Sequence, residues 1–147
     1  MISIRPGNLA LIDQMSDLFN QYRIFYGQKD DLKKARCFLL ERISSKDSTI
    51  ILGSDHNKFV GFMQLYPSFS SVRLQSIYVL NDLYVHSEYR NKGIASALIN
   101  EAKSICKTEK NGGLQLETSK MNRANQLYKK LGFNLIDDTN FYSWSVQ

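Results

Sequence analysis

Residues 81–99, NDLYVHSEYRNKGIASALI, place a β-type run directly before a polar turn and a segment with helical apolar spacing. Gly93 stands where the helix begins, although glycine is a poor helix former, and Arg90 and Lys92 precede it. A helix start exposes unpaired backbone N–H groups and the positive end of the helix dipole, which together favour anions. Two interpretations stay open from this stretch alone: a solvated helix start, or a backbone cradle for a phosphate.

The composition predicts one domain over residues 1–147, long enough to bury a core without disulfides. Cys37 and Cys106 have no spacing typical of a zinc site, and we expect both to be core thiols. The 19 basic and 14 acidic side chains give a net charge of +5, but no dense basic block indicates nucleic-acid binding. No segment has the pattern of a leader or a membrane span. We therefore expect a soluble cytoplasmic protein with no metal and no nucleic-acid or membrane partner.

Strand-like and helix-like segments alternate along the chain. The late strand–helix–strand units require parallel pairing, whereas the early strands pair as hairpins around turns such as SDHN, residues 54–57. The order β-αα-βββ-α-β-α-ββ predicts a mixed α/β (α+β) fold, whose twisted mixed sheet of six to seven strands has helices on both faces. Strands are expected at 2–6, 48–53, 58–67, 72–85, 114–118, 133–136 and 141–146, and helices at 9–25, 32–43, 93–108 and 122–131.

A carboxylate interrupts the apolar strand at LNDLYV, residues 80–85. By strict alternation Asp82 shares one face with Leu80 and Tyr84. A carboxylate in such a strand is unfavourable unless it is paired or lies at a cleft. Asp82 is therefore either a paired structural group or a functional carboxylate that binds a cation or accepts a proton. A bulge in the strand would change which face each residue occupies.

Tyr128 and an aromatic cluster around Arg23 are further candidates. Tyr128 lies beside the core stripe of the predicted helix 122–131. It is either a half-buried core residue or a phenol at the edge of a cleft that donates a proton. Tyr22 and Tyr26 flank Arg23 at the end of the first predicted helix, and this cluster is either core packing or a substrate-lining segment.

Taken together, these residues resemble the GNAT family of N-acetyltransferases. The acetyl-CoA motif of that family, R/Q-x-x-G-x-G/A, corresponds to residues 90–95, RNKGIA. Its second motif, which ends in LYxKxGF, corresponds to residues 124–133, ANQLYKKLGF. The motifs stand at the family's usual distance, and the resemblance covers the whole order of elements. It implies the GNAT-type acyl-CoA N-acyltransferase fold and direct attack of an amine on the acetyl group of acetyl-CoA.

The resemblance also implies a role for each candidate. The backbone of Val85 would polarise the thioester carbonyl, and residues 90–95 would hold the pyrophosphate. Tyr128 would protonate the leaving thiolate, and Asp82, directly or through water, would take the proton of the amine. The residues implied to contact the co-substrate acetyl-CoA are Leu83, Tyr84, Val85, Arg90, Asn91, Lys92, Gly93, Ile94, Ala95, Ser96, Asn122, Asn125 and Tyr128. Those implied to contact the amine substrate are Tyr22, Arg23, Tyr26, Asn81 and Asp82.

Two departures from the family pattern bear on these roles. Met121 stands where many members have an asparagine seven residues before the tyrosine, so the contact with acetyl-CoA falls to Asn122 or Asn125. Asn81 stands where polyamine acetyltransferases of the family often carry a glutamate, which leaves Asp82 as the candidate base.

The nearest resemblance is to small amine and amino-acid acetyltransferases, which commonly form homodimers, and the C-terminal segment with Trp144 is a candidate interface. The expected function is N-acetylation of a primary amine of a small molecule, such as a polyamine or an amino acid. A protein lysine or N-terminal acetyltransferase and a non-catalytic acyl-CoA-binding sensor are the alternatives. A polyamine substrate calls for an acidic pocket, for which the candidates are Asp30, Asp31, Asp82 and Glu88.

Overall fold

The chain forms five strands and four α-helices in the computed structural model, which describes residues 1–147. None of the helices is long and apolar enough to cross a membrane. The strands are β1 (Ile2–Pro6), β2 (Thr49–Asp55), β3 (Lys58–Ser70), β4 (Gln75–Val85) and β5 (Leu114–Gln115). The helices are α1 (Ile12–Phe25), α2 (Leu32–Ser44), α3 (Ile94–Thr108) and α4 (Ala124–Lys130), with short 3-10 turns η1 (Leu9–Leu11) and η2 (Ser87–Tyr89).

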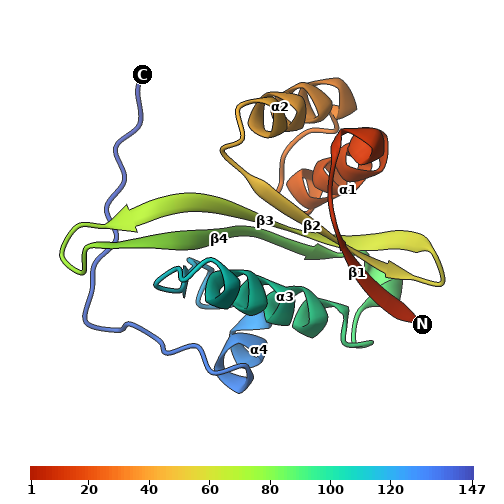
Figure 1. Cartoon of the computed structure of the whole chain (residues 1–147). Helices are drawn as coiled ribbons and strands as arrows, with labels where there is room; N and C mark the ends of the chain where they lie inside the picture. Colours follow the sequence, from red (N-terminus) through yellow and green to blue (C-terminus); the bar gives the residue numbers. More distant parts are fainter. The chain divides into compact units, whose positions relative to one another are not determined.

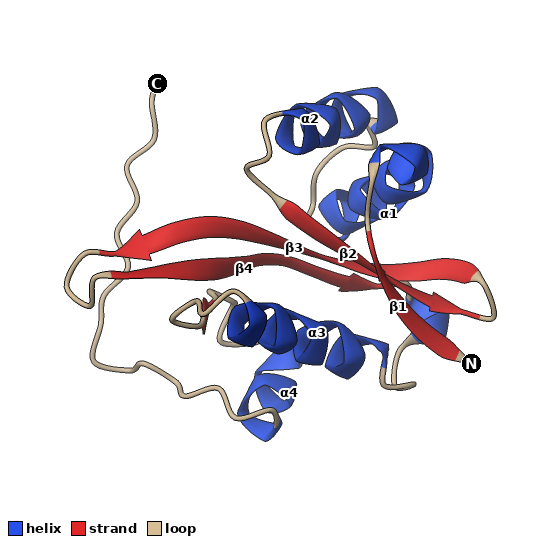
Figure 2. Ribbon diagram, in the orientation of Figure 1, coloured by secondary structure: helices blue, strands red, loops and turns tan.

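Residues 1–117 and residues 118–147 form two compact units. In the first unit the sheet lies between helices, with α1 and α2 on one face and α3 on the other (Figure 1 and Figure 2). Apolar residues of α1 and α2 form a buried cluster with Leu52 of β2 and Phe62 of β3. On the other face α3 packs so closely that a Cβ added to Gly53 would lie 2.9 Å from Ile94 Cγ2. The expected helices on both faces are therefore confirmed.

Four strands of the sheet pair antiparallel in the order of the sequence, β1-β2-β3-β4. The turn between β2 and β3 places His56 at φ 48° and Asn57 at φ 69°. Left-handed backbone at both central residues is the conformation that suits a tight hairpin to the twist of its strands. The expected hairpin around SDHN is confirmed.

β4 has a complete neighbour on only one side. Along β3 it is paired over its whole length, whereas the parallel strand β5 pairs only at Tyr78 and Val79. The backbone of residues 80–85 therefore has no strand partner on the second edge. α3 makes the crossover from β4 to β5, as parallel pairing requires.

A bulge interrupts the pairing of β3 and β4. Gln64 pairs with Asp82, but the next residue, Leu65, pairs with Leu80, which leaves Asn81 as the extra residue of β4. Leu80 consequently lies on the opposite face from Asp82, because paired residues share a face and neighbouring ones do not. Strict alternation predicted that Leu80 shares a face with Asp82, and this prediction was wrong.

The two cysteines differ in their surroundings. Cys106 of α3 is buried, as expected, but Cys37 is exposed on α2. The buried side chains of α2 are Ala35 and Leu39, four residues apart on one stripe, and Cys37 lies between them on the far side of the helix. The expectation of a core thiol was wrong for Cys37.

The second unit contains α4 and an irregular C-terminal segment. Residues 133–136 and 141–146 were expected to be the last two strands, but they form no strand, so the sheet has five strands rather than six to seven. A strand forms only where a neighbour accepts its backbone hydrogen bonds, and alternation in the sequence does not supply that neighbour. The apolar side chains of this segment are accordingly exposed: Leu135, Ile136, Phe141, Tyr142, Trp144 and Val146.

Candidate active site

Asp82 is the one buried carboxylate of the chain, with 2% of its surface exposed. The bulge at Asn81 and the pairing with Gln64 place it on the sheet face that α1 and α2 cover. Gln64 shares that face with Phe62, two residues earlier on β3, which packs in the α1–α2 cluster. The carboxylate therefore lies beneath the helices and not on the α3 side.

A chain of hydrogen bonds holds the Asp82 carboxylate. Ser48 Oγ donates to Gln64 Oε1 at 2.7 Å, and Gln64 Nε2 donates to Asp82 Oδ2 at 2.5 Å. On the other oxygen, Asn81 Nδ2 donates to Asp82 Oδ1 at 2.7 Å. Each carboxylate oxygen has two lone pairs, so both keep the capacity to accept a further proton or hydrogen bond.

Burial raises the pKa of the Asp82 carboxyl above its ordinary value, and hydrogen bonds from Asn81, Gln64 and Tyr22 oppose the shift. Burial, with a contribution from the Asp82 charge, also raises the pKa of Tyr22 and raises that of Tyr66 to about 12. Both phenols are therefore neutral near pH 7, whereas Asp82 is a stronger base than an exposed aspartate.

Asp82 lies at the wall of a pocket of about 390 Å³. Of the residues that the sequence predicted to contact substrate, the pocket brings together Tyr22, Arg23, Asn81 and Asp82. Tyr26 is not part of the lining: it packs edge-on against Tyr22 and is about half exposed. The other lining residues are Phe19, Lys34, Ala35, Phe38 and Tyr66.

Four of these five residues were missed in the sequence for an identifiable reason. Phe19 and Ala35 belong to the buried stripes of α1 and α2, so their spacing indicates core packing. Lys34 has the pattern of an ordinary exposed lysine. Tyr66 is placed at the pocket by the register between β3 and β4, which no local pattern specifies.

The open edge of β4 lies beyond this pocket along the strand. His86 N–H donates to the Val60 carbonyl at 2.8 Å, so His86 faces β3. Because successive residues of a strand direct their N–H and C=O groups to opposite edges, those of Val85 point to the open edge. Arg90 Nε donates to the Val85 carbonyl there at 2.9 Å, which leaves the Val85 N–H as a donor at that edge.

The predicted helix start at Gly93 is confirmed. Gly93 has φ +84°, a left-handed conformation suited to glycine, and supplies no side-chain cap to α3. The first intrahelical bond runs from Ala97 N–H to the Gly93 carbonyl, so the three preceding N–H groups have no such partner. A Cβ added at Gly93 would meet no atom within 4 Å. The turn thus has free donors and room for a ligand, and it fits a pyrophosphate.

Side chains around this turn pack against other residues of the protein. The Arg90 guanidinium lies 5.1 Å from the centroid of the Phe25 ring and 5.9 Å from that of Tyr84. Ile94 is buried against the sheet, so only its backbone faces a ligand. The remaining predicted contacts lie half-buried or exposed nearby: Leu83, Asn91, Lys92, Ala95 and Ser96.

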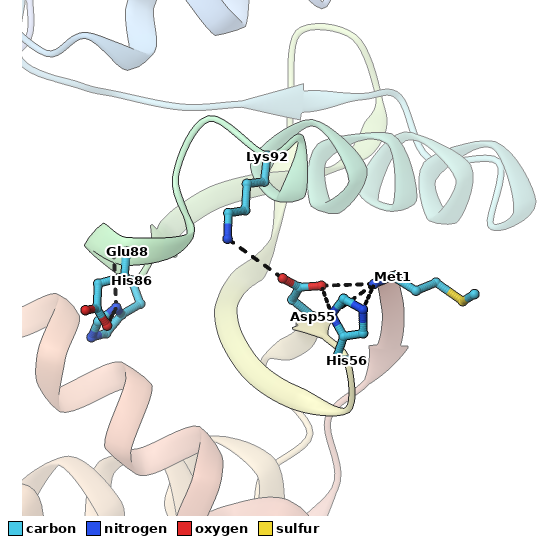
Figure 3. A network of polar contacts seen from close by, with 6 residues as sticks. All are labelled: Met1, Asp55, His56, His86, Glu88 and Lys92. Carbon is cyan, nitrogen blue, oxygen red and sulfur yellow. Dashed lines mark hydrogen bonds and ion pairs between the residues drawn. The ribbon is translucent and has the colours of Figure 1, made fainter.

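Lys92 reaches from the turn before α3 toward the end of β2 (Figure 3). Its Nζ lies 4.0 Å from Asp55 Oδ2 and 4.8 Å from the centroid of the Tyr89 ring. The other Asp55 oxygen accepts from the Met1 amino group at 3.0 Å. The lysine is about half exposed and its ion pair is at the distance limit, so the contact is weak and leaves Lys92 able to move.

The predicted residues of the second unit hold their own turn. Asn122 donates to Thr118 Oγ1 at 2.9 Å and accepts from Ala124 N–H at 2.9 Å. Asn125 Nδ2 donates to backbone carbonyls, with the shortest bond, 2.7 Å, to that of Asn122. Tyr128 is half-buried and packs edge-on against Phe133, with ring centroids 5.7 Å apart. A role of these residues toward acetyl-CoA stays a prediction.

Comparison with known proteins points to one family. The family described as "Acetyltransferase (GNAT) domain" matches residues 46–135. A Bacillus subtilis (strain 168) protein named an uncharacterized N-acetyltransferase is 39% identical over 146 residues, which cover 99% of this chain and 97% of that protein. The crystal structure of a probable acetyltransferase is 33% identical with a TM-score of 0.91, covering 99% of this chain and 98% of that one. An aminoglycoside acetyltransferase from a soil metagenome has a TM-score of 0.86 at 13% identity, over 99% and 97% of the two chains, and shares the fold alone.

Proposed function

Because the chain belongs to the GNAT family of acetyltransferases, which use acetyl-CoA as co-substrate, we propose that it transfers the acetyl group of acetyl-CoA to a primary amine of a small molecule. The observation that carries the choice of a small acceptor is the pocket of about 390 Å³ with Asp82 in its wall. A pocket of this size suits a small molecule, and a carboxylate beside it suits an amine.

The proposed reaction is direct attack in a ternary complex. The amine nitrogen forms a bond to the acetyl carbon, the carbon–sulfur bond breaks, and the products are an amide and CoA. An alkyl amine with a pKa of about 10.4 is mostly protonated near pH 7, so a base has to remove a proton before or during attack. In becoming the amide the protonated amine loses two protons: the sulfur receives one as it leaves as the thiol, and the other is released to solvent.

We assign the base role to Asp82, directly or through a water molecule. Its raised pKa makes it a better proton acceptor near neutral pH than an exposed aspartate. The bonds from Asn81 and Gln64 fix the orientation of the carboxylate. After the transfer the proton passes to solvent through the pocket mouth.

We assign the acetyl-CoA site to the open edge of β4 and the start of α3. The free Val85 N–H is suited to polarise the thioester carbonyl, because a fixed backbone donor stabilises the oxyanion that develops there. The uncapped N–H groups after Gly93, with Arg90 and Lys92 nearby, suit the pyrophosphate. Leu83 and Tyr84 lie on the same strand segment and complete the proposed groove with Asn91, Ile94, Ala95 and Ser96.

Tyr128 is our candidate for the acid that protonates the CoA thiolate, and Asn122 or Asn125 for a further contact with acetyl-CoA. The support is the match of residues 124–133 to the second family motif. Within their own unit these residues form an ordered turn and helix start. The effect of Tyr128→Phe on turnover tests this assignment.

A screen for CoA release tests the proposed function. The purified chain is incubated with acetyl-CoA and, separately, with amino acids, polyamines, aminoglycosides and lysine-containing peptides, and the free thiol is measured. We expect thiol release with at least one small amine and little with peptides. Release with peptides alone would instead favour a protein acetyltransferase. Binding of acetyl-CoA with no release from any amine would favour an acyl-CoA sensor.

We also propose that the chain forms a homodimer through its C-terminal segment. Phe141, Tyr142, Trp144 and Val146 are each at least 72% exposed, and neighbouring exposed apolar side chains favour association. Sedimentation analysis of the wild type and of Trp144→Ser tests this, and an unchanged monomer at all concentrations would refute it. The cytoplasmic location stays a prediction from the sequence.

A further inference from the structure

Two cationic side chains border the pocket that holds Asp82. Arg23 reaches it from α1, and Lys34 reaches it from α2. Asp82 is the only acidic residue in the lining, and its burial favours the neutral form. The lining is therefore net positive even when Asp82 is ionised, and it favours a ligand that carries a negative charge as well as an amine.

One buried nitrogen of the Arg23 guanidinium, Nη1, has no hydrogen-bond partner within the protein. A buried charged donor without an acceptor is unfavourable, so native structures rarely leave one without a ligand or water. A carboxylate suits this group, because the guanidinium fork matches the two carboxylate oxygens.

Lys34 is free to take part at the mouth of the pocket. Its side chain is 85% exposed, and its ion pair with Asp31 spans 3.7 Å. An exposed ion pair of this kind contributes little to the stability of the fold. The Lys34 ammonium group can therefore turn toward a ligand with little loss of stability.

The acidic residues that a polyamine would require do not converge on the pocket. Asp30 accepts from Asn20 Nδ2 at 2.8 Å, and Asp31 caps the first turn of α2. Glu88 lies in η2 beside His86. None of these three acids lines the pocket. A molecule with two or more ammonium groups would meet a single carboxylate and two cations, which disfavours it.

We propose that the acceptor is an amine that also carries a carboxylate, as an amino acid does, with the carboxylate bound by Arg23 and Lys34. This inference rests on the proposed function. The amine then lies toward Asp82, which takes its proton while nitrogen bonds to the acetyl carbon and CoA leaves as the thiol. Aromatic side chains form the rest of the wall and suit an acceptor with an apolar side chain: Phe19, Tyr22, Phe38 and Tyr66.

The test compares each amino acid with its carboxamide and with its decarboxylated amine. Phenylalanine, methionine and lysine each supply such a set. The carboxamide keeps the shape but removes the charge, and the amine of an α-amino amide is also less protonated than an alkyl amine. Faster reaction of the acid than of the amide therefore cannot come from the acidity of the amine. We expect kcat/KM for the preferred acid to exceed that for its amide by at least about tenfold, as for one charge-assisted contact.

Variants assign the preference to the two cations. The ratio measured is kcat/KM for the acid divided by kcat/KM for its amide. In Arg23→Gln this ratio should fall toward one. In Lys34→Gln it should fall only in part, and Arg23→Lys should keep part of the wild-type ratio. Lys33→Gln is the matched control, since it removes the same charge from the neighbouring exposed position of α2, outside the pocket. The ratio is measured within one preparation, so it does not depend on how much of a variant is folded.

Each outcome separates the two proposals. A wild-type ratio of one or less, with the amide acetylated, overturns the carboxylate inference and leaves the acetyltransferase function in place. A ratio that survives the double variant Arg23→Gln/Lys34→Gln overturns the assignment to these side chains. Absence of acetylation in every set, while another small amine of the wider screen is acetylated, overturns this inference alone, and absence of release from every amine of that screen overturns the proposed function as well.

Discussion

Asp82 of β4 lies directly opposite Gln64 of β3, and the Gln64 amide joins its carboxylate to the Ser48 hydroxyl in one buried chain of hydrogen bonds. Gln64 is fully buried and Asp82 nearly so. Burial raises the pKa of the carboxyl above its ordinary value, although the hydrogen bonds oppose the shift, and the donors fix the position of the carboxylate.

Replacing Asp82 with asparagine should remove the proposed base while keeping the size of the side chain. We expect kcat/KM at neutral pH to fall by roughly 10²–10⁴-fold, the usual contribution of a general base. The loss should shrink as the pH approaches the pKa of the amine, because the amine then loses its proton to solvent. Steady-state thiol release measures both effects. Asp17→Asn, on the exposed side of α1, is the control, and equal rates for Asp82→Asn and the control would rule out the base role.

Replacing Gln64 with leucine should change the pH profile. Activity requires ionised Asp82, so kcat rises with pH through the Asp82 pKa, which lies above that of an ordinary aspartate. In the wild type the hydrogen bond from Gln64 lowers the pKa of Asp82. Without this bond the Asp82 pKa should rise, so the acidic limb of the variant's pH–rate profile should move to higher pH. Urea unfolding should show that the free energy of unfolding falls by about 1–3 kcal/mol, because Ser48 and Asp82 each lose a hydrogen-bond partner.

The exposed Gln14→Leu is the control for that variant. The limb should be absent in Asp82→Asn, which identifies the titrating group. A Gln64→Leu profile that superimposes on the wild type would mean that the Asp82 pKa does not control the rate.

Replacing Gly93 with alanine should weaken acetyl-CoA binding. The left-handed backbone at φ +84° costs alanine about 1 kcal/mol, and its methyl group would enter the space proposed for the pyrophosphate. Gly27→Ala is a matched control, because Gly27 has φ +86° and equally open surroundings but lies after α1. Both variants should lose similar stability, and calorimetry should show an affinity loss of about tenfold or more only for Gly93→Ala. Equal affinities in the two variants would count against the phosphate cradle.

Replacing Tyr128 with phenylalanine should lower turnover and leave acetyl-CoA affinity nearly unchanged. A proton donor to the leaving group contributes on the order of 10²-fold or more, whereas the aromatic contact with Phe133 survives the change. Tyr142→Phe, in the same unit and 84% exposed, is the control. If kcat for Tyr128→Phe equals that of the control, the acid is another group.

Local patterns in the sequence were enough to predict most of the elements of the first unit. The helices that begin at Ile12, Leu32 and Ile94 and the hairpin around His56 depend on apolar spacing and turn residues within a few positions of one another. The helix start at Gly93 was also predictable, because the strand, turn and helix around it are consecutive in the chain.

Features that depend on distant pairing were not predictable in this way. The terminal strands failed because a neighbouring strand, and not alternation around Phe141 or Trp144, decides whether a segment pairs. Lys34 and Tyr66 join the pocket only through the packing of α2 and the register of β3. Their local surroundings are those of an ordinary helix and strand.

The bulge at Asn81 has a consequence for insertions and deletions in this strand. Side chains alternate between the two faces of the sheet both before and after the bulge, but the extra residue shifts this alternation by one position. The sequence Leu80-Asn81-Asp82 can therefore send an apolar side chain to one layer and a carboxylate to the other, although the two are an even number of residues apart. A one-residue deletion at Asn81 would make the pairing regular and keep Leu80 and Asp82 in their separate layers, but it would also remove the amide that donates to Asp82 Oδ1.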